Sequence, residues 1–317
     1  MINILANDGI SQSGKDALDN AGFNISTITV AQEQLANHIQ SNDIAVLLVR
    51  SATTVRKDLI DRCPNLKIIG RGGVGMDNID VEYARSKGIN VINTPAASSS
   101  SVAELVFAHL YGGVRFLHES NRNMPLEGDS NFKKLKKAYA KGVELRGKTI
   151  GIVGFGRIGR ETAKIALGIG MKVLAYDKFL KEASITLKFS HEKSVEFNIK
   201  ISKFNYLLEN SDFISLHVPA QKEFIIDKKQ FELMKDGVGI INAARGGVLN
   251  EVELISALDS GKVSFAGLDT FENEPKPEIK LLMHPNISLT PHIGAATNEA
   301  QDRIGKELAD QISNILN

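Results

Sequence analysis

The sequence contains a single cysteine and carries almost no net charge. Cys63 has no second cysteine with which to pair, so an intramolecular disulfide framework is excluded and a reducing compartment is expected. An isolated cysteine is more often a small buried apolar side chain than a reactive thiol, and we expect Cys63 in a core. The formal net charge of +1 provides no field that would gather nucleic acid or an anionic membrane. We therefore expect neither as a partner.

Long apolar runs are also missing. No segment approaches the roughly 18 apolar residues needed to cross a bilayer. The amino terminus, MINILANDGI, leads into a strand-like segment and lacks the charged start, apolar centre and cleavage site of a signal peptide. A cytoplasmic protein without a membrane segment is the resulting expectation.

What the chain does contain is a repeated alternation of short apolar runs and longer helix-like stretches. The first series runs through INILAN, FNISTITV, IAVLLVR, LKIIGR and INVINT, and a second runs from KTIGIVGFG through DFISLHVP and GVGIINAA to NISLTPH. Such alternation indicates parallel sheets covered by helices on both faces. At 317 residues, with 43% hydrophobic and 24% charged residues, the chain has material for two cores. We predict an α/β protein with two doubly wound, Rossmann-like domains.

A glycine pattern opens the second series. Gly154, Gly156 and Gly159 form G-x-G-x-x-G directly between an apolar strand and a helix-like stretch, the context in which these glycines cradle a dinucleotide pyrophosphate. Asp177 ends the next strand, where a carboxylate can accept hydrogen bonds from the adenine ribose. This favours NAD, although a strand-end turn residue is the alternative for Asp177 and the adjacent Lys178 could tolerate NADP.

Three residues are candidates for acid–base chemistry on a small carboxylic acid, such as the oxidation of a 2-hydroxy acid. Arg245 follows an apolar strand and could bind a carboxylate bidentately. His292 follows another strand, and imidazoles titrate near neutrality, as a general acid and base requires. Glu274 could pair with His292 and stabilise its imidazolium. Taken alone, a histidine at a strand end is more often structural than catalytic, and no metal site is indicated.

The motifs VRSAT, IIGRGGVGMDNID, SVAEL, GIVGFGRIG, DFISLHVP, INAARGGVLNE, GLDTFENEP and TPHIGAAT resemble those of D-2-hydroxy acid dehydrogenases, in the same order and over nearly the whole chain. The resemblance implies that Arg245 anchors the substrate carboxylate, that His292 is the general acid and base, and that Glu274 is its partner. It also implies a set of residues along the NAD: Val74, Gly154, Gly156, Arg157, Ile158, Gly159, Asp177, His217, Val218, Pro219, Ala243, Ala244, Asp269, Gly294 and Ala295. Asp269 is expected near the nicotinamide amide.

The same resemblance implies a discontinuous flavodoxin-like substrate domain, residues 1–97 plus 289–317, around an NAD-binding domain, residues 98–288. A cleft between them is expected to close on ligand. A homodimer through the cofactor domains is also implied.

Within the family, the phosphoglycerate dehydrogenases that begin serine biosynthesis look most similar, which implies oxidation of 3-phospho-D-glycerate to 3-phosphohydroxypyruvate. Two arginines near a glycine-rich turn suit a phosphate. The expected substrate residues are Arg50, Ser51, Arg71, Gly72, Gly73, Val74, Gly75, Ser98, Arg245 and His292. A plain strand-to-helix turn with exposed arginines is the alternative reading of this loop.

Several features depart from the family pattern. Ser98 stands where relatives often have asparagine, residues 184–202 extend a connection and could form an extra hairpin, and the sequence stops without a regulatory extension. Lysines at 133, 134, 136, 137 and 141 could reach a substrate phosphate across a dimer interface, or simply form a solvated helix face. A glyoxylate or hydroxypyruvate reductase of the same family is the nearest alternative function. A cofactor-sensing protein resembling corepressors of this fold is a more distant one.

Overall fold

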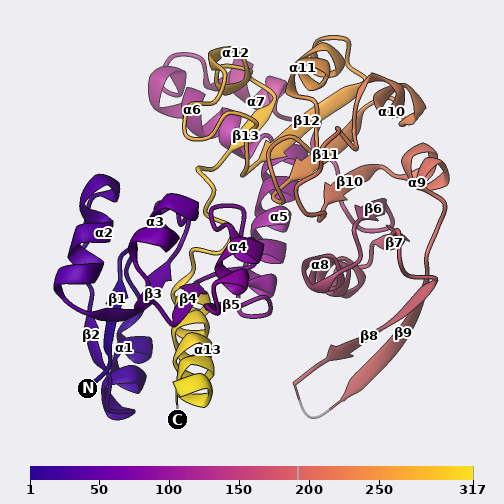
Figure 1. The fold of residues 1–317 in the computed structure, drawn as a ribbon. Coiled ribbons are helices and arrows are strands. Elements are labelled where there is room, and N and C mark those ends of the chain that lie inside the picture. The colour runs from indigo at the N-terminus through magenta and orange to yellow at the C-terminus, as the bar shows by residue number, and fades with distance from the viewer. Residues whose placement is uncertain (191–192, 317) are drawn as a thin grey trace. The chain divides into compact units, whose positions relative to one another are not determined.

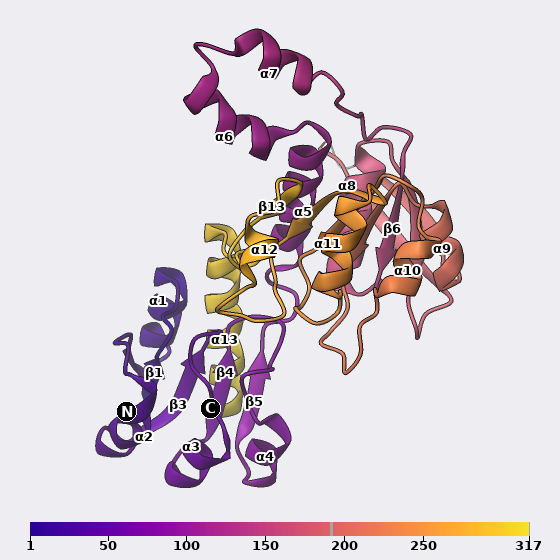
Figure 2. The same cartoon turned by 90° about the horizontal axis from the view of Figure 1, so that it is seen from above.

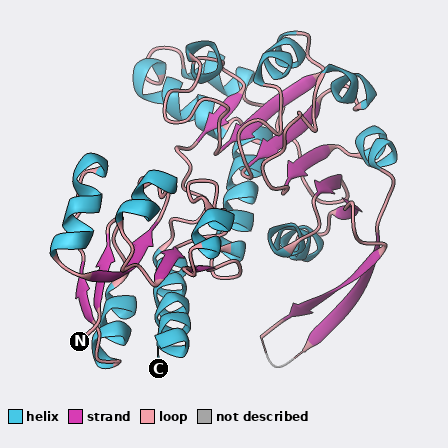
Figure 3. Ribbon diagram, in the orientation of Figure 1, coloured by secondary structure: helices cyan, strands magenta, loops and turns pink. Residues whose placement is uncertain are grey.

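The computed structural model describes residues 1–190 and 193–316, and the chain divides into two compact units. Unit 1 comprises Met1–Ser101 and Ala295–Asn317, and unit 2 comprises Val102–Gly294. Each unit contains one parallel sheet with helices on both faces (Figures 1 and 3), which confirms the predicted α/β class with two doubly wound sheets. No helix in the described ranges is long and apolar enough to span a membrane.

Both unit boundaries fall a few residues after the expected positions, at 101 instead of 97 and at 294 instead of 288. The hydroxyls of Ser101 and Thr297 lie 2.9 Å apart, which attaches the segment before residue 102 to unit 1. At the other boundary, the backbone N–H of Thr290 donates to Leu268 O and that of Gly294 donates to Asp269. These bonds keep residues 289–294 on the edge of the sheet in unit 2.

The sheet of unit 1 has five parallel strands in the order β2-β1-β3-β4-β5, which is the flavodoxin-like order. Its strands are β1 (Asn3–Ala6), β2 (Asn24–Ser26), β3 (Ile44–Val49), β4 (Ile68–Arg71) and β5 (Asn90–Asn93). Its helices are α1 (Gln12–Asn20), α2 (Gln32–Ser41), α3 (Lys57–Arg62), α4 (Val81–Ser86) and α13 (Asn298–Leu316). Helix α5 (Ser99–Val114) begins in unit 1 and continues into unit 2.

Alternation along each strand divides the apolar side chains of unit 1 between two cores. Leu5 and Leu47 pack with α2, α3 and α4, whereas Ile4 and Val46 pack with α1 and α13. Cys63 is 1% exposed within the first of these cores, as expected, and burial raises the pKa of its thiol. Both faces of the sheet are therefore apolar, as in other parallel sheets.

Unit 2 contains six parallel strands in the order β13-β12-β11-β10-β6-β7. The strands are β6 (Thr149–Val153), β7 (Lys172–Tyr176), β10 (Phe213–Leu216), β11 (Val238–Asn242), β12 (Val263–Leu268) and β13 (Ile287–Leu289). The helices around the sheet are α5, α8 (Arg157–Gly168), α9 (Phe204–Asn210), α10 (Lys228–Leu233), α11 (Glu251–Asp259) and α12 (Ile279–Leu282). Neighbouring residues again face opposite cores, for example Ile240 and Ile241 of β11.

The direction of chain progression reverses between two neighbouring strands in each sheet, β1 and β3 in unit 1 and β6 and β10 in unit 2. Loops leaving the carboxyl ends of such strands diverge and form the crevice in which open α/β sheets bind ligands. The loops that follow these four strands are therefore the expected positions of a ligand-binding site.

Two parts of unit 2 lie outside its helix and sheet layers. Helices α6 (Leu117–Glu127) and α7 (Phe132–Ala138) extend away from the sheet as an arm (Figure 2), and α7 contains four of the five lysines noted in the sequence. Strands β8 (Glu182–Lys188) and β9 (Ser194–Lys200) form an antiparallel ribbon, which confirms the predicted extra hairpin within the described residues. Ala183 and Ile185 anchor this hairpin in the core that contains residues of α8.

A close helix contact in unit 1 leads to the first prediction. A Cβ on Gly14 of α1 would lie 2.6 Å from the Cα of Gly305 in α13. We expect Gly14→Ala to destabilise the protein by about 1–3 kcal/mol, because two helix backbones would have to separate. Gly112→Ala, within α5, meets no atom within 4 Å. This control should be neutral or stabilising by up to about 1 kcal/mol. Urea unfolding measures both, and equal midpoints would contradict the packing argument.

Candidate active site

The three glycines of the G-x-G-x-x-G pattern have three different surroundings. Gly154 follows β6 with φ +94°, and a Cβ there would lie 2.4 Å from the carbonyl oxygen of His217. A Cβ on Gly159 would lie 2.2 Å from Gly154 O, whereas one on Gly156 would meet nothing within 4 Å. The outer glycines thus allow the tight turn and the close approach of helix α8. The middle one leaves open space at the helix N-terminus, where a pyrophosphate fits.

Asp177 follows β7 and lies beside this loop. Its Oδ2 accepts a hydrogen bond of 2.9 Å from the N–H of Phe155, and its Oδ1 accepts one of 2.9 Å from the N–H of Phe179. The carboxylate is therefore oriented by the glycine loop itself. Its contact with a ribose stays a prediction, and the fixed orientation supports it.

The ring of His217 is hydrogen-bonded within unit 2, and its expected place along the cofactor stays a prediction. The Nε2 atom lies 2.9 Å from Ser215 Oγ and 3.2 Å from Thr162 Oγ1, and burial lowers the pKa of His217 to about 3. A neutral imidazole is thus enclosed within unit 2. Only its backbone lies against the glycine turn, next to Val218 and the exposed Pro219.

The loop that carries Arg245 follows β11, next to β10 in the sheet. Asn242 shapes this loop, since its Nδ2 donates to Arg245 O at 2.9 Å and its Oδ1 accepts from Ala244 N at 3.1 Å. The guanidinium Nη1 donates to Ala244 O at 2.7 Å. Ala243 and Ala244 are each 8% exposed, so their backbone, more than their side chains, could face a cofactor.

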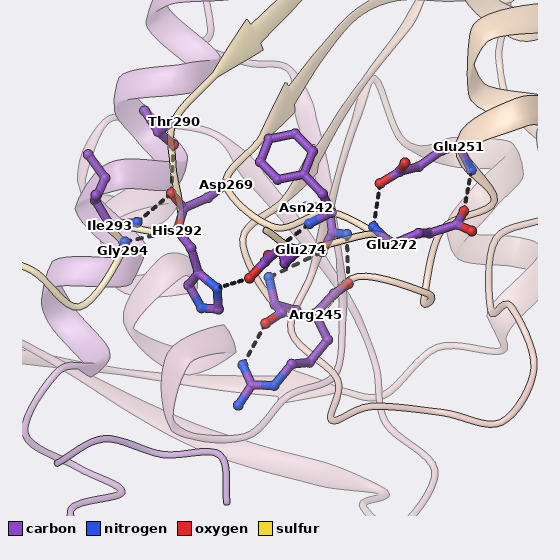
Figure 4. A network of polar contacts seen from close by, with 12 residues as sticks. Asn242, Arg245, Glu251, Asp269, Glu272, Glu274, Thr290, His292, Ile293 and Gly294 are labelled. Atoms are coloured by element: carbon purple, nitrogen blue, oxygen red, sulfur yellow. Dashed lines mark hydrogen bonds and ion pairs between the residues drawn. The ribbon is translucent and has the colours of Figure 1, made fainter. Parts of the chain in front are cut away.

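The predicted pair of Glu274 and His292 is present. His292 Nδ1 lies 2.8 Å from Glu274 Oε2, while Glu274 Oε1 accepts a 3.0 Å bond from Phe271 N (Figure 4). The His292 side chain is 40% exposed, which leaves its Nε2 edge accessible. An Nδ1–H bond to a carboxylate fixes the tautomer in which Nε2 can accept a proton.

Asp269, at the end of β12, is 1% exposed and has no unused carboxylate oxygen. Oδ1 accepts from Thr290 Oγ1 at 2.7 Å and from Ile293 N at 2.8 Å, and Oδ2 accepts from Gly294 N at 2.8 Å (Figure 4). The expected contact with a nicotinamide amide stays a prediction. What the structure does place here is an anchor for the segment on both sides of His292.

Glu251, which we did not select from the sequence, supports the same region. Its N–H donates to Glu272 Oε1 and its own Oε1 accepts from Glu272 N, both at 2.8 Å (Figure 4). This reciprocal pair ties the start of α11 to the segment that carries Glu274. Burial, together with the charges of Glu272, Glu278 and Glu274, raises the pKa of Glu251 to about 7. The sequence signal was weak, since a glutamate in a first helical turn is common.

The expected substrate residues of unit 1 follow β3 and β4. Asp8, at the end of β1, accepts a 2.6 Å bond from Arg50 N and also binds Thr53. Asn78 Nδ2 donates to the carbonyl oxygens of Arg50 and Thr53, at 2.8 and 2.7 Å. The backbone around Arg50 and the exposed Ser51 is thus fixed from two sides.

The glycine-rich turn after β4 differs in part from expectation. Gly73 has φ +149°, a backbone conformation that other residues rarely adopt, and the end of the Arg71 side chain folds back beside it. Gly72 N donates to Val49 O and Gly73 N to Arg71 O, so these two N–H groups are used within the protein. An anion nest would have to use the N–H groups of Val74 and Gly75 instead. Ser98 is 1% exposed and therefore buried, which limits its contact with a substrate.

Comparison with protein families identifies the middle of the chain. Residues 107–294 match the family model described as D-isomer specific 2-hydroxyacid dehydrogenase, NAD binding domain. This match confirms the family resemblance and NAD as the cofactor.

Curated relatives match over most of the chain. A D-3-phosphoglycerate dehydrogenase of Archaeoglobus fulgidus is 40% identical over 98% of the chain, and one of Methanocaldococcus jannaschii is 39% identical over 100%. The chain spans only 57% and 58% of the length of these two relatives. A hydroxypyruvate reductase of Thermotoga maritima is 45% identical over 85% of the chain and 84% of its own length.

Solved structures show the same fold over nearly the whole chain. The TT0316 protein of Thermus thermophilus superposes with a TM-score of 0.83 at 27% identity, over 97% of this chain and 94% of the other. A glyoxylate reductase of Paecilomyes thermophila gives 0.81 at 28% identity, over 98% and 94%.

The raised pKa of Glu251 predicts a pH-dependent stability. Because the pKa of Glu251 is higher in the folded than in the unfolded protein, the folded state binds the proton more tightly. The free energy of unfolding therefore falls as the pH rises from the unfolded pKa, near 4.5, through the folded pKa of about 7. The loss would reach at most about 3 kcal/mol. Glu251→Gln is neutral throughout, so its urea midpoint should vary less between pH 5 and 8 than that of the native protein. Glu253→Gln in the same helical turn is the control. Parallel pH curves for native protein and Glu251→Gln would contradict the assignment.

Proposed function

The chain belongs to the D-isomer specific 2-hydroxyacid dehydrogenase family, and we propose that it oxidises 3-phospho-D-glycerate to 3-phosphohydroxypyruvate with NAD. The observation that carries a dehydrogenase function is the 2.8 Å contact between His292 and Glu274. Both residues lie on loops at the carboxyl ends of the sheet that also presents the glycine loop. Such loops form the ligand crevice of doubly wound sheets.

In this proposal His292 moves the proton of the reaction. The neutral imidazole, with Nδ1–H bonded to Glu274, accepts the C2 hydroxyl proton at Nε2 as the C2–H bond breaks and the C2–O bond becomes a carbonyl. NAD, when bound, would supply the acceptor for the hydride that leaves C2. Glu274 stabilises the imidazolium that forms, and Arg245 holds the substrate carboxylate through its guanidinium. Reduction of the 2-oxo acid uses the same groups in reverse.

The phosphate is proposed to bind in unit 1. Arg50 follows β3 and Arg71 is the last residue of the neighbouring β4, and the loop of Arg50 is held by Asp8 and Asn78. Guanidinium groups on a fixed backbone suit a phosphate because each can form two parallel hydrogen bonds.

A 2-oxo acid reductase is a second candidate, because the Thermotoga relative named hydroxypyruvate reductase is matched over most of its own length. Its unphosphorylated substrate would leave Arg50 without a phosphate partner. A cofactor-sensing binding protein is a further alternative, and it would bind NAD without turning over any 2-oxo acid.

We further propose that the arm of α6 and α7 takes part in a homodimer. Leu126 is 78% and Phe132 56% exposed, a degree of apolar exposure that another copy of the chain would cover. Lysines of α7 could then reach the substrate of the partner. Light scattering of the native protein and of Leu126→Asp with Phe132→Asp tests the interface.

The substrate preference follows from the phosphate proposal. We expect NADH oxidation with 3-phosphohydroxypyruvate to exceed that with hydroxypyruvate, which differs only by the phosphate. Arg50→Ala should raise the KM for the phosphorylated substrate by about 10–100-fold, as expected for a lost charged hydrogen bond, with little effect on hydroxypyruvate. Arg56→Ala, which breaks the 3.0 Å pair with Asp80 in the same unit, is the control. A native preference for hydroxypyruvate would favour the reductase reading.

The hydrogen bond from His292 Nδ1 to Glu274 predicts the effect of Glu274→Gln. The new amide can donate to Nδ1, which leaves the proton on Nε2 and removes the base. We expect kcat to fall by about 10²–10⁴-fold, the usual contribution of a general base, with a small change in KM. Glu278→Gln removes a nearby charge outside the pair and should leave kcat within a factor of about two. An unaltered kcat in Glu274→Gln would exclude this role of the carboxylate.

A further inference from the structure

A network of four polar side chains lies behind the loop of His292; His109 and Asp269 are buried, and Ser288 and Thr290 are half-buried. His109, on helix α5, is 3% exposed; its Nδ1 lies 2.9 Å from Ser288 Oγ and its Nε2 lies 3.0 Å from Thr290 Oγ1. Thr290 in turn contacts Asp269 Oδ1 at 2.7 Å. The network thus connects α5 to the carboxylate that anchors the catalytic loop, entirely within unit 2.

The chemistry of these groups fixes the direction of each hydrogen bond. A carboxylate only accepts, so the Thr290 hydroxyl donates to Asp269. Its oxygen is then the acceptor for His109 Nε2–H. Burial lowers the pKa of His109 and keeps the ring neutral, so Nδ1 accepts from the Ser288 hydroxyl. With these hydrogen-bond directions, each side-chain polar atom of His109, Ser288, Thr290 and Asp269 has a partner.

His109 is an unusual residue for its position. The neighbouring residues Val106, Phe107 and Leu110 of α5 are buried and apolar. A buried imidazole is costly unless both nitrogens are bonded. A Cβ on Gly267 of β12 would lie 2.6 Å from the Cβ of His109, so only glycine leaves room for the histidine side chain there. The space and the hydrogen bonds are therefore both arranged around this histidine.

The Asp269 end of the network holds a strained backbone. His292 has φ +54°, a left-handed conformation that costs non-glycine residues about 1–3 kcal/mol. Thr290 precedes it and Ile293 and Gly294 follow it, and all three donate to Asp269. Anchors on both sides thus keep His292 in the conformation that directs Nδ1 toward Glu274.

We propose that His109 is a positioning residue for the proton transfer, acting through Thr290 and Asp269 on the backbone at His292. The proposal rests on the proposed function of His292 as the general acid and base. It makes the orientation of an exposed imidazole depend on a buried one that never contacts substrate or cofactor.

The kinetic test uses variants that remove the hydrogen-bonding groups. His109→Phe replaces the imidazole with an aromatic ring that has no nitrogens, and Thr290→Val replaces the hydroxyl with a methyl. We expect each to lower kcat by at least about tenfold, since small displacements of a catalytic group are costly, while the KM for NADH stays within twofold. His109→Gln and Thr290→Ser, which retain a donor and a hydroxyl, should recover part of the lost kcat. Because the two residues act in one network, the double variant should lose no more than the worse single one.

A spectroscopic test does not depend on turnover. In the native protein ¹⁵N NMR should report His292 as the Nδ1–H tautomer, and His109→Phe or Thr290→Val should give a mixture. The proposal is overturned if the variants have a lower melting temperature but keep the native kcat at temperatures well below it, and if the His292 tautomer is unchanged. If the native protein turns over no 2-oxo acid and the tautomer still shifts, the positioning stands and the proposed function fails.

Discussion

The carboxylate of Asp269 accepts hydrogen bonds from Thr290 Oγ1, Ile293 N and Gly294 N, and the geometry of the site depends on these three contacts. They fix the chain before and after His292, so its left-handed backbone does not relax. With the backbone fixed, Nδ1 of the imidazole lies 2.8 Å from Glu274 Oε2. One buried side chain thereby sets the position of a group whose own side chain is 40% exposed. An exposed side chain cannot be held by packing, so its precision has to come from the backbone beneath it.

Parallel sheet topology explains why these groups can meet at all. The glycine loop, the loop of Arg245 and the segment after β12 leave the carboxyl ends of strands β6, β11 and β12. Strands spaced by less than 5 Å bring residues distant in sequence to one edge. The apolar side chains that fill both faces of the sheet keep that edge rigid, and the polar residues are confined to the loops. Stability and chemistry therefore use different parts of each βα unit.

Much of this could be predicted from the sequence, because the relevant signals are local. The alternation of apolar runs predicted the two parallel sheets. The spacing of Gly154, Gly156 and Gly159 predicted a tight turn between a strand and a helix, and the structure contains this turn. The pairing of Glu274 with His292 came from the motifs that carry the family resemblance. The extra hairpin of β8 and β9 was predicted from a connection longer than that of relatives.

The remaining features depend on partners far apart in the chain. The ring of His217 lies within hydrogen-bonding distance of Thr162, 55 residues earlier in the chain. Gly72 and Gly73 have the composition of an anion nest, yet Val49 O and Arg71 O take their N–H groups. His109 lies in an apolar helical stretch, and its role depends on Ser288 and Thr290, about 180 residues later. No pattern within one segment encodes such a contact.

Two buried acids near the site show how differently the fold treats negative charge. Asp269 has three donors and is satisfied as a carboxylate. Glu251 receives one N–H bond, from Glu272, among three other glutamates, and its pKa is about 7. Near neutral pH the second arrangement costs stability that an apolar residue would not. The same arrangement orients the site, since the reciprocal bonds of Glu251 and Glu272 fix the segment from which Glu274 contacts His292. Like the strained backbone at His292, it is a local cost located where orientation matters for catalysis.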